Sequence, residues 1–362
     1  MLETISQILQ KETFTKNDLI TLLSVKSPEA MQVILDKAYQ VKSEMVGRKV
    51  YLRGLIELSN ICSKNCFYCG IRMSNTKVER YTLSKEEVVE AATFAWKQGF
   101  GSIVIQTGEQ KSNIFTQFVE ELLLEIHSKT NNELTITLSC GEQSLEVYKS
   151  WRKAGAQRFL LRIETTNHEL YYQIHPKDEN HSFEKRIEAI KNLQSAGFQV
   201  GTGVMIGLPN QSIEDLANDL IFFKAMEIDM IGMGPYLEHS DTPLSSEKAL
   251  LWPVDERFKI SLLMIALARI SMPDINIASS TALETIDLFG RQKGLLAGAN
   301  VVMPNLTPVP SRVKYQLYNN KPNLDKNATL SVVSLQKIIT EIGEEIAFNE
   351  AGNSLHFSNR QA

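Results

Sequence analysis

The amino-acid sequence predicts an α/β protein built as a (β/α)8 barrel, with a helical segment in front of it. Three observations lead to this prediction. The 362 residues contain no low-complexity stretch or Pro/Gly-rich linker, short β-rich runs recur along the chain, and helical patterns separate these runs. The pattern leaves open whether the barrel closes, and a doubly wound parallel sheet is the alternative architecture.

Eight runs have the length and composition of buried strands. They cover residues 51–58, 102–107, 134–139, 158–164, 199–207, 229–235, 275–281 and 299–304. With these strands, we expect a helical N-terminal segment over residues 1–45, the barrel over 46–310, and a C-terminal segment over 311–362 that packs on the barrel.

Helix signals lie between the runs. Ser84 and Glu87 form a capping-box pattern at the start of one helix, and Gly99 follows its end. Ser212 precedes a second helix, whose apolar stripe consists of Ile213, Leu216, Leu220 and Phe223. A third helix is expected to begin near Phe183 and to end before Gly197.

The composition is that of a globular protein without strong charge imbalance. Hydrophobic residues make up 43% of the chain and charged residues 22%, and the formal net charge is −4. A protein that coats nucleic acid would be more basic. No apolar stretch reaches the roughly 18 residues of a membrane span, and the N-terminus lacks the pattern of a signal peptide. We therefore expect a cytoplasmic protein that binds neither nucleic acid nor membranes.

Alternation along the strands predicts polar side chains inside the barrel, because successive residues face opposite sides. In the run 158–164 the odd positions are apolar, so Arg158, Arg162 and Glu164 should face inward. The same parity gives an inward set on three other strands: Arg53, Glu57, Thr135, Thr137, Gly201 and Gly203, with the glycines leaving space. Buried charges are costly unless they are paired or bind a ligand, which favours a polar cavity. The simpler alternative is that single charges reach solvent at the barrel mouth.

Three of the four cysteines, Cys62, Cys66 and Cys69, lie within eight residues directly after the first predicted strand. A large cytoplasmic protein has little need of disulfides, so clustered thiols are expected to be metal ligands or catalytic groups and not structural cross-links. Three thiolates on a four-iron cluster leave one iron free for another ligand. A zinc site completed by a distant histidine is the alternative, and Cys140 is expected to be a core residue.

The Cys-x3-Cys-x2-Cys spacing, with Tyr68 before the last cysteine, resembles the signature of the radical S-adenosylmethionine (SAM) superfamily. The resemblance implies a 4Fe–4S cluster that cleaves SAM to a 5′-deoxyadenosyl radical. It also implies a SAM site made of Tyr68, Gly108, Glu109, Arg162, Glu164, Arg186 and Met205. In this site Glu109 would bind the methionine amine, Glu164 the ribose, and Arg162 or Arg186 the carboxylate. Thr107-Gly108-Glu109 looks like the Gly-Gly-Glu element of the superfamily with Thr at the first position. The simpler alternatives are a helix N-terminal charge for Glu109 and a solvated helix face for Arg186.

Longer segments resemble the HydE-type FeFe-hydrogenase maturases. They include IELSNICSKNCFYCGIR, QTGEQ, LLRIETTN, MIGLPNQSIEDL, DMIGMGPYLEHSDTPL and ANVVMPNLTP. The resemblance implies that the radical acts on a mononuclear iron complex carrying carbon monoxide, cyanide and cysteine. The implied partners are the radical SAM tyrosine lyase and the GTPase scaffold of the same maturation system, with a flavodoxin or ferredoxin as electron donor.

The same resemblance implies a pocket for the iron complex. Gln106, Thr107, Thr137 and Arg158 would be catalytic, and Met230, Ser280, Thr281, Met303, Tyr315 and Tyr318 would bind the substrate together with Arg53. Arginines and hydroxyl groups would hold an anionic complex, and methionines would shield it. Met230 and Met303 are alternatively plain core residues.

The sequence departs from the family pattern at two places. The segment YNNKPNLDKNATLSVV lacks the cysteines of a second cluster, so one cluster is expected. Ile163 stands where relatives can have His, but it should face outward. Biotin synthase is disfavoured because only Cys140 remains for its second cluster. The open alternatives are a methylornithine synthase-like mutase and a non-catalytic iron–sulfur carrier, which would not cleave SAM.

Overall fold

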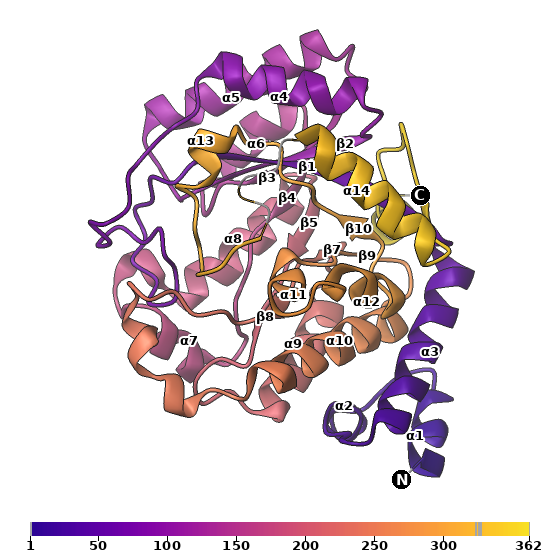
Figure 1. Cartoon of the computed structure of the whole chain (residues 1–362). Coiled ribbons are helices and arrows are strands. Elements are labelled where there is room, and N and C mark those ends of the chain that lie inside the picture. The colour runs from indigo at the N-terminus through magenta and orange to yellow at the C-terminus, as the bar shows by residue number, and fades with distance from the viewer. Residues whose placement is uncertain (1, 323, 325–327, 362) are drawn as a thin grey trace.

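In the computed structural model, eight parallel strands form a nearly closed barrel (Figure 1). The structure describes residues 2–322, 324 and 328–361. The strand order is β10-β1-β2-β3-β4-β5-β7-β9. A bridge between Ala278 and Val301, with a 2.9 Å hydrogen bond from Asn300 N to Ile277 O, joins the two ends of the sheet. The barrel prediction is confirmed, and the doubly wound alternative is wrong because an open sheet would leave β9 and β10 apart.

The strands are shorter than the expected runs toward the C-terminal half. Their bounds are β1 (Lys49–Ser59), β2 (Ser102–Thr107), β3 (Thr135–Ser139), β4 (Ala156–Leu160), β5 (Gln199–Thr202), β7 (Met230–Ile231), β9 (Asn276–Ile277) and β10 (Val301–Val302). The run 199–207 breaks at Gly203, and a second short pair, β6 (Met205–Ile206) and β8 (Gly234–Pro235), forms beyond the break. The prediction that Gly201 leaves open space inside the barrel is wrong, because a side chain at this position would contact Leu160 and Met230.

Helices surround the barrel as Figure 1 shows. They are α4 (Lys85–Lys97), α5 (Asn113–Lys129), α6 (Leu145–Lys153), α7 (His168–Ile174), α8 (Phe183–Ser195), α9 (Ile213–Ala225), α10 (Val254–Ser271), α11 (Thr281–Ile286), α12 (Gly290–Leu296) and α13 (Val309–Arg312). Short 3-10 turns occur at Glu179–His181, Pro243–Ser246 and Lys248–Leu250. The capping boxes at Ser84 and Ser212 are both present, and Gly197 follows α8 with a φ of +82°. None of the described helices is both long and apolar enough to cross a membrane.

The inner and outer faces of β4 follow the expected parity. Phe159, Leu161 and Ile163 are buried in the hydrophobic core toward the helices, whereas Arg158 lies on the opposite side and is fully buried. The regular strand nevertheless ends at Leu160. Glu164 follows in a left-handed backbone conformation, with a φ of +69°.

The two chain ends both pack on the barrel. The N-terminal helices α1 (Leu2–Leu9), α2 (Lys16–Leu23) and α3 (Pro28–Met45) lie beside α9 and α10. After α14 (Ala328–Glu341), β11 (Glu345–Ile346) pairs with the beginning of β1, residues 350–354 cross the N-terminal end of the barrel, and α15 (Leu355–Gln361) follows. The expected terminal segments also include residues 1, 323, 325–327 and 362, which lie outside the described residues.

Candidate active site

The cysteine loop follows β1 at the C-terminal end of the barrel. Side-chain hydrogen bonds hold its backbone where helix or strand hydrogen bonds are missing. Arg80 donates hydrogen bonds to the carbonyls of Asn60, Ile71, Arg72 and Asn75 at 2.6–3.1 Å. These bonds satisfy buried carbonyls that no strand or helix partner reaches. The loop therefore has a defined shape despite its irregular backbone.

Cys62, Cys66 and Cys69 line one cavity of about 270 Å³. The Cys62 sulfur accepts backbone N–H groups from Lys64 and Glu109 at 3.4 and 3.3 Å. Burial raises the pKa of all three thiols, that of Cys66 to about 12. The thiols therefore stay protonated until a metal replaces their protons. Cys140 is buried in the core instead, as expected.

The donor set of this loop fits an iron–sulfur cluster better than a single ion. Within the described part of the chain, no three Cys, His, Asp or Glu side chains converge as the ligands of one metal ion would. A four-iron cluster distributes its protein ligands over separate iron atoms, so it needs no such convergence. The nearby Lys64 and Arg186 favour thiolates, since their charges lower the pKa of Cys66 against the effect of burial.

Gly108 allows the second strand to approach the cysteine loop. A side chain at this position would collide with the carbonyl of Ile61 and with Cys62. The next residue, Glu109, then lies below the loop, and Ser63 N donates to its carbonyl at 2.8 Å. The expected Thr-Gly-Glu element and the cysteine loop thus form one unit.

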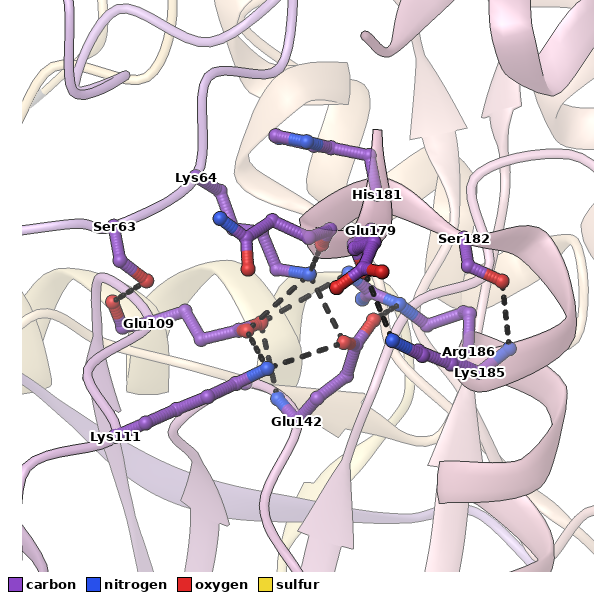
Figure 2. A network of polar contacts seen from close by, with 12 residues as sticks. Ser63, Lys64, Glu109, Lys111, Glu142, Glu179, His181, Ser182, Lys185 and Arg186 are labelled. Atoms are coloured by element: carbon purple, nitrogen blue, oxygen red, sulfur yellow. Dashed lines mark hydrogen bonds and ion pairs between the residues drawn. The ribbon is translucent and has the colours of Figure 1, made fainter. Parts of the chain in front are cut away.

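A network of charged side chains surrounds Glu109 (Figure 2). Lys64 pairs with Glu109 at 3.3 Å and with Glu142 at 2.9 Å, and Lys111 pairs with Glu109 at 3.2 Å. Arg186 Nε donates to Glu142 at 2.6 Å. Burial would raise the pKa of Glu142, but Arg186 and Lys64 lower it to about 2. Both simpler alternatives are wrong, because Glu109 is buried beside the cysteines and Arg186 faces the network and not solvent.

The residues expected to bind SAM share the cavity of the cysteines: Tyr68, Gly108, Glu109, Arg162, Glu164, Arg186 and Met205. Arg162 lies 2.9 Å from Glu164 and also donates to the carbonyl of Val204. Burial raises the pKa of Glu164, while Arg162 and Arg186 oppose the shift. The structure brings these side chains together, and their individual roles remain predictions.

Tyr68 is held by a histidine that the sequence analysis did not identify. The Tyr68 hydroxyl lies 3.3 Å from Nε2 of His175, whose Nδ1 lies 2.9 Å from the carbonyl of Tyr171. A carbonyl only accepts, so Nδ1 carries the proton and Nε2 accepts from Tyr68. Burial holds the pKa of His175 well below its usual value, which keeps the ring neutral.

The residues expected to bind or act on the substrate lie in three different parts of the structure. Gln106, Thr107, Ser280, Tyr315 and Tyr318 line the same cavity as the cysteines. Arg53, Thr137, Arg158 and Met230 are buried deeper in the barrel, below Ser139 and Leu160 of the cavity wall. Thr281 and Met303 instead line a separate cavity of about 70 Å³ with Arg291 and Asn305. The roles of all these residues remain predictions.

Three charged residues of the site were not identified from the sequence. Lys64 and Glu142 belong to the network around Glu109, and Lys321 reaches into the barrel to pair with Glu57. Glu142 had a usable signal, because Gly141-Glu142 follows β3 as Gly108-Glu109 follows β2. No sequence pattern marked Lys321, since it lies 264 residues from its partner Glu57.

The sequence is similar to members of one enzyme superfamily. The model of the Radical SAM superfamily matches residues 56–223. The FeFe hydrogenase maturase subunit HydE of Thermotoga maritima is 39% identical over 337 residues, which cover 93% of each chain. The 3-methylornithine synthase of Methanosarcina barkeri is 28% identical over 307 residues, covering 83% of this chain and 82% of the other.

Solved structures show the same architecture. The crystal structure of methylornithine synthase (PylB) has a TM-score of 0.80 and 25% identity, covering 96% of this chain and 98% of the other. The maturase HydG from Carboxydothermus hydrogenoformans has a TM-score of 0.79 at 21% identity, covering 96% and 80%, a likeness of fold alone. Identity of 39% along nearly the whole chain, with the three cysteines in one cavity, shows that this chain belongs to the HydE family of radical SAM enzymes, whose cofactors are a 4Fe–4S cluster and S-adenosylmethionine.

Proposed function

We propose that this protein acts in FeFe-hydrogenase maturation and that its substrate is a mononuclear iron complex carrying carbon monoxide, cyanide and cysteine. The name of its Thermotoga relative, a hydrogenase maturase subunit, supports the maturation role. The proposed partners are the radical SAM tyrosine lyase and the GTPase scaffold. A flavodoxin or ferredoxin would supply the electron, and the cytoplasm is the proposed location.

In this proposal the cavity of the cysteines binds the cofactors, and the deeper part of the barrel around Arg53 and Arg158 binds the substrate. When bound, the cluster and SAM supply a 5′-deoxyadenosyl radical. Cys62, Cys66 and Cys69 would hold the cluster, and Glu164 would accept hydrogen bonds from the SAM ribose. Glu109 would bind the amine of SAM, and in the structure it already pairs with the cations of Lys64 and Lys111.

The observation that carries the substrate assignment is a pair of buried arginines that have no carboxylate partner among the described residues. Arg53 and Arg158 lie deep in the barrel, and their hydrogen bonds go to Met230, Asn353 and the carbonyls of Ala351 and Gly352. Burial lowers the pKa of Arg53 to about 10 and that of Arg158 well below its usual value. An anionic ligand would relieve this cost, as cyanide and carboxylate groups would do.

The amino-acid mutase alternative has less support inside the barrel. A free amino acid would need an acceptor for its ammonium group. The carboxylate of Glu57 is the obvious candidate, but Lys321 already pairs with it and Asn305 donates to it at 3.0 Å. In the described part of the barrel interior, Arg53 and Arg158 therefore keep unpaired donors while Glu57 is already paired, which favours an anion.

Replacing Arg158 with Ala tests the proposal. We expect the variant to retain its cluster and SAM affinity, to cleave SAM unproductively, and to mature no hydrogenase. The measurement is hydrogenase activity after anaerobic expression with the hydrogenase and the other maturases, alongside 5′-deoxyadenosine formation by the purified variant.

Arg152→Ala on α6 serves as the matched control, because this arginine lies on the outer side of the barrel. Normal maturation by Arg158→Ala would contradict the deep substrate site. Loss of SAM affinity would instead show that Arg158 belongs to the cofactor site. Failure of the parent protein to support maturation would contradict the proposed function as a whole.

A further inference from the structure

We propose that residues 351–353 form a neutral plug at the N-terminal end of the barrel, which holds Arg53 and Arg158 in place without cancelling their charge. Asn353 is then a positioning residue for the anionic substrate, through its contact with Arg158. This inference rests on the proposed function for the identity of the anion, and its test is chosen to be independent of that identity.

The plug is attached by hydrogen bonds to side chains of several strands. Arg158 Nη2 donates to Ala351 O and to Asn353 Oδ1, both at 2.6 Å. Arg53 Nη2 donates to Gly352 O at 3.3 Å, and Asn276 donates to the same oxygen at 2.9 Å. Through these bonds the plug spans β1, β4 and β9.

Gln199 on β5 adds a reciprocal pair of bonds to this attachment. Its side-chain amide donates to Asn353 Oδ1 at 2.9 Å and accepts from Ser354 N at 3.0 Å. The backbone geometry is equally specific. Gly352 has a φ of +63°, and a side chain there would strike the ring of Tyr51. The plug therefore has one defined position under the barrel.

Every acceptor that the plug offers to the two arginines is uncharged. Buried arginines are usually paired with carboxylates, because an unpaired buried charge is costly. The segment contains a carboxylate next to the plug, Glu350, but this side chain turns outward and pairs with Lys49 at 2.6 Å. The arrangement thus satisfies hydrogen bonds of Arg53 and Arg158 while leaving both positive charges unneutralised.

Other polar groups beside these contacts remain unpaired. Nε and Nη1 of Arg158, Nε of Arg53 and the hydroxyl of Thr137 are buried and have no partner among the described residues. Thr137 is the direct neighbour of Arg158 in the β3–β4 register. The plug contacts only one nitrogen of each guanidinium. Nη1 of Arg53 donates to the Met230 sulfur at 3.0 Å, so Nε and Nη1 of Arg158 and Nε of Arg53 stay available to an anion.

Asn353→Asp tests this inference, because Asp can accept the same two hydrogen bonds but adds a negative charge beside Arg158. Position 353 is exposed on its outer side, so the variant should fold. We expect its melting temperature to equal or exceed that of the parent and its SAM affinity to be unchanged. Hydrogenase maturation should fall by about 10-fold or more, the loss of one charge-assisted interaction.

A second measurement uses bromide as the probe, located by its anomalous scattering in soaked crystals of the holoenzyme. Bromide should lie beside Arg158 in the parent protein and be lost in Asn353→Asp. Gln361→Glu, an amide-to-acid change at an exposed position of α15, is the matched control and should behave as the parent in every measurement.

Wild-type maturation together with bromide retained beside Arg158 in Asn353→Asp would overturn the inference, since the charge of Arg158 would then be unnecessary. Should the Asp variant fail to fold, Asn353→Ala takes its place, because loss of the acceptor should also displace Arg158 and its bromide. Unchanged bromide in that variant would equally overturn the inference. A parent protein that binds bromide but matures no hydrogenase would refute the proposed function and leave the plug supported.

Discussion

Glu164 has a backbone conformation that is costly for a residue of its type. Its φ of +69° lies in the left-handed region, which a residue other than Gly, Asn or Asp adopts at a cost of roughly 1–2 kcal/mol. The conformation directs the carboxylate into the cavity of the cysteines, where Arg162 lies 2.9 Å away. Backbone strain of this kind concentrates at binding sites, which supports the expected role of Glu164 toward SAM.

Glu164→Gln should therefore weaken SAM binding with little effect on the fold. The substitution preserves shape but exchanges an acceptor oxygen for a donor. Charge-assisted hydrogen bonds contribute roughly 1.5–3 kcal/mol, so we expect a loss of SAM affinity of about 10- to 100-fold by anaerobic titration. Glu169→Gln, at an exposed position of α7, is the control. Equal affinities in the two variants would remove Glu164 from the site.

Single replacements of Cys62, Cys66 or Cys69 with Ala should each abolish cluster-dependent SAM cleavage. The barrel should stay folded, because these residues lie outside the hydrophobic core. The measurement is 5′-deoxyadenosine formation after reconstitution with iron and sulfide, with circular dichroism to check the fold. Cys140→Ala is the control and should keep its cluster. Parent-like turnover in any of the first three variants would refute the ligand assignment.

At the scale of elements, α9 holds the loop that follows Glu164. Asp219 accepts from the backbone N–H and the hydroxyl of Thr166 at 2.8 and 2.5 Å, and Asp215 accepts from the Asn167 amide at 2.7 Å. Burial raises the pKa of Asp219 to about 7, with a smaller contribution from Asp215. The loop thus depends on a carboxyl group that is largely protonated below neutral pH.

This carboxyl group predicts a specific pH dependence of stability. Between its ordinary pKa near 3.8 and about 7, the folded protein keeps a proton that the unfolded chain has released. Folding stability should therefore fall as pH rises through this window and level off above it. Asp219→Asn should remove that fall, which amounts to at most roughly 4 kcal/mol.

Anaerobic melting temperatures at pH 5 and pH 8 provide the measurement for Asp219. The gain of Asp219→Asn over the parent should be larger at pH 8. The exposed Asp255→Asn on α10 should show no such difference between the two pH values. A gain that is independent of pH would mean that Asp219 is ionised in the folded protein throughout this range.

At the scale of the whole molecule, a buried ion pair connects the two chain ends. Lys42 on α3 and Glu344, directly before β11, are both fully buried and lie 2.5 Å apart. Lys42 also donates to the carbonyl of Leu295, and the Tyr39 hydroxyl donates to Glu344 at 2.7 Å. The N-terminal helices and the C-terminal segment are therefore linked through one buried contact beside the barrel.

Lys42→Met should destabilise the protein by roughly 3–5 kcal/mol, because it leaves the Glu344 carboxylate buried without its cation. Anaerobic denaturant unfolding measures the change. The double variant Lys42→Met, Glu344→Gln should recover part of the loss. Lys259→Met breaks an exposed pair with Asp255 and should cost less than about 1 kcal/mol. Equal losses in the two single variants would show that burial of the Lys42 pair is unimportant.

Features that depend on neighbouring residues could be predicted from the sequence alone. The capping boxes at Ser84 and Ser212, the inward parity of Arg158 and the cysteine spacing are local patterns, and each appears in the structure as expected. Strand ends were less predictable, because the break at Gly203 lies where Gly232, between β7 and β8, approaches closely.

Contacts between distant segments were decided only by the tertiary structure. Asn353 meets Arg158 across 195 residues, and Lys42 meets Glu344 across 302. The partners of Lys64 and the joining of β9 to β10 likewise follow from how the whole barrel packs. The physical reason is that periodicity and spacing encode how a segment folds, whereas its partner depends on shape and charge complementarity with residues that no local pattern marks. The sequence by itself therefore determined the barrel and the cluster loop. Only the tertiary structure decided that residues 351–353 cover the N-terminal end of the barrel.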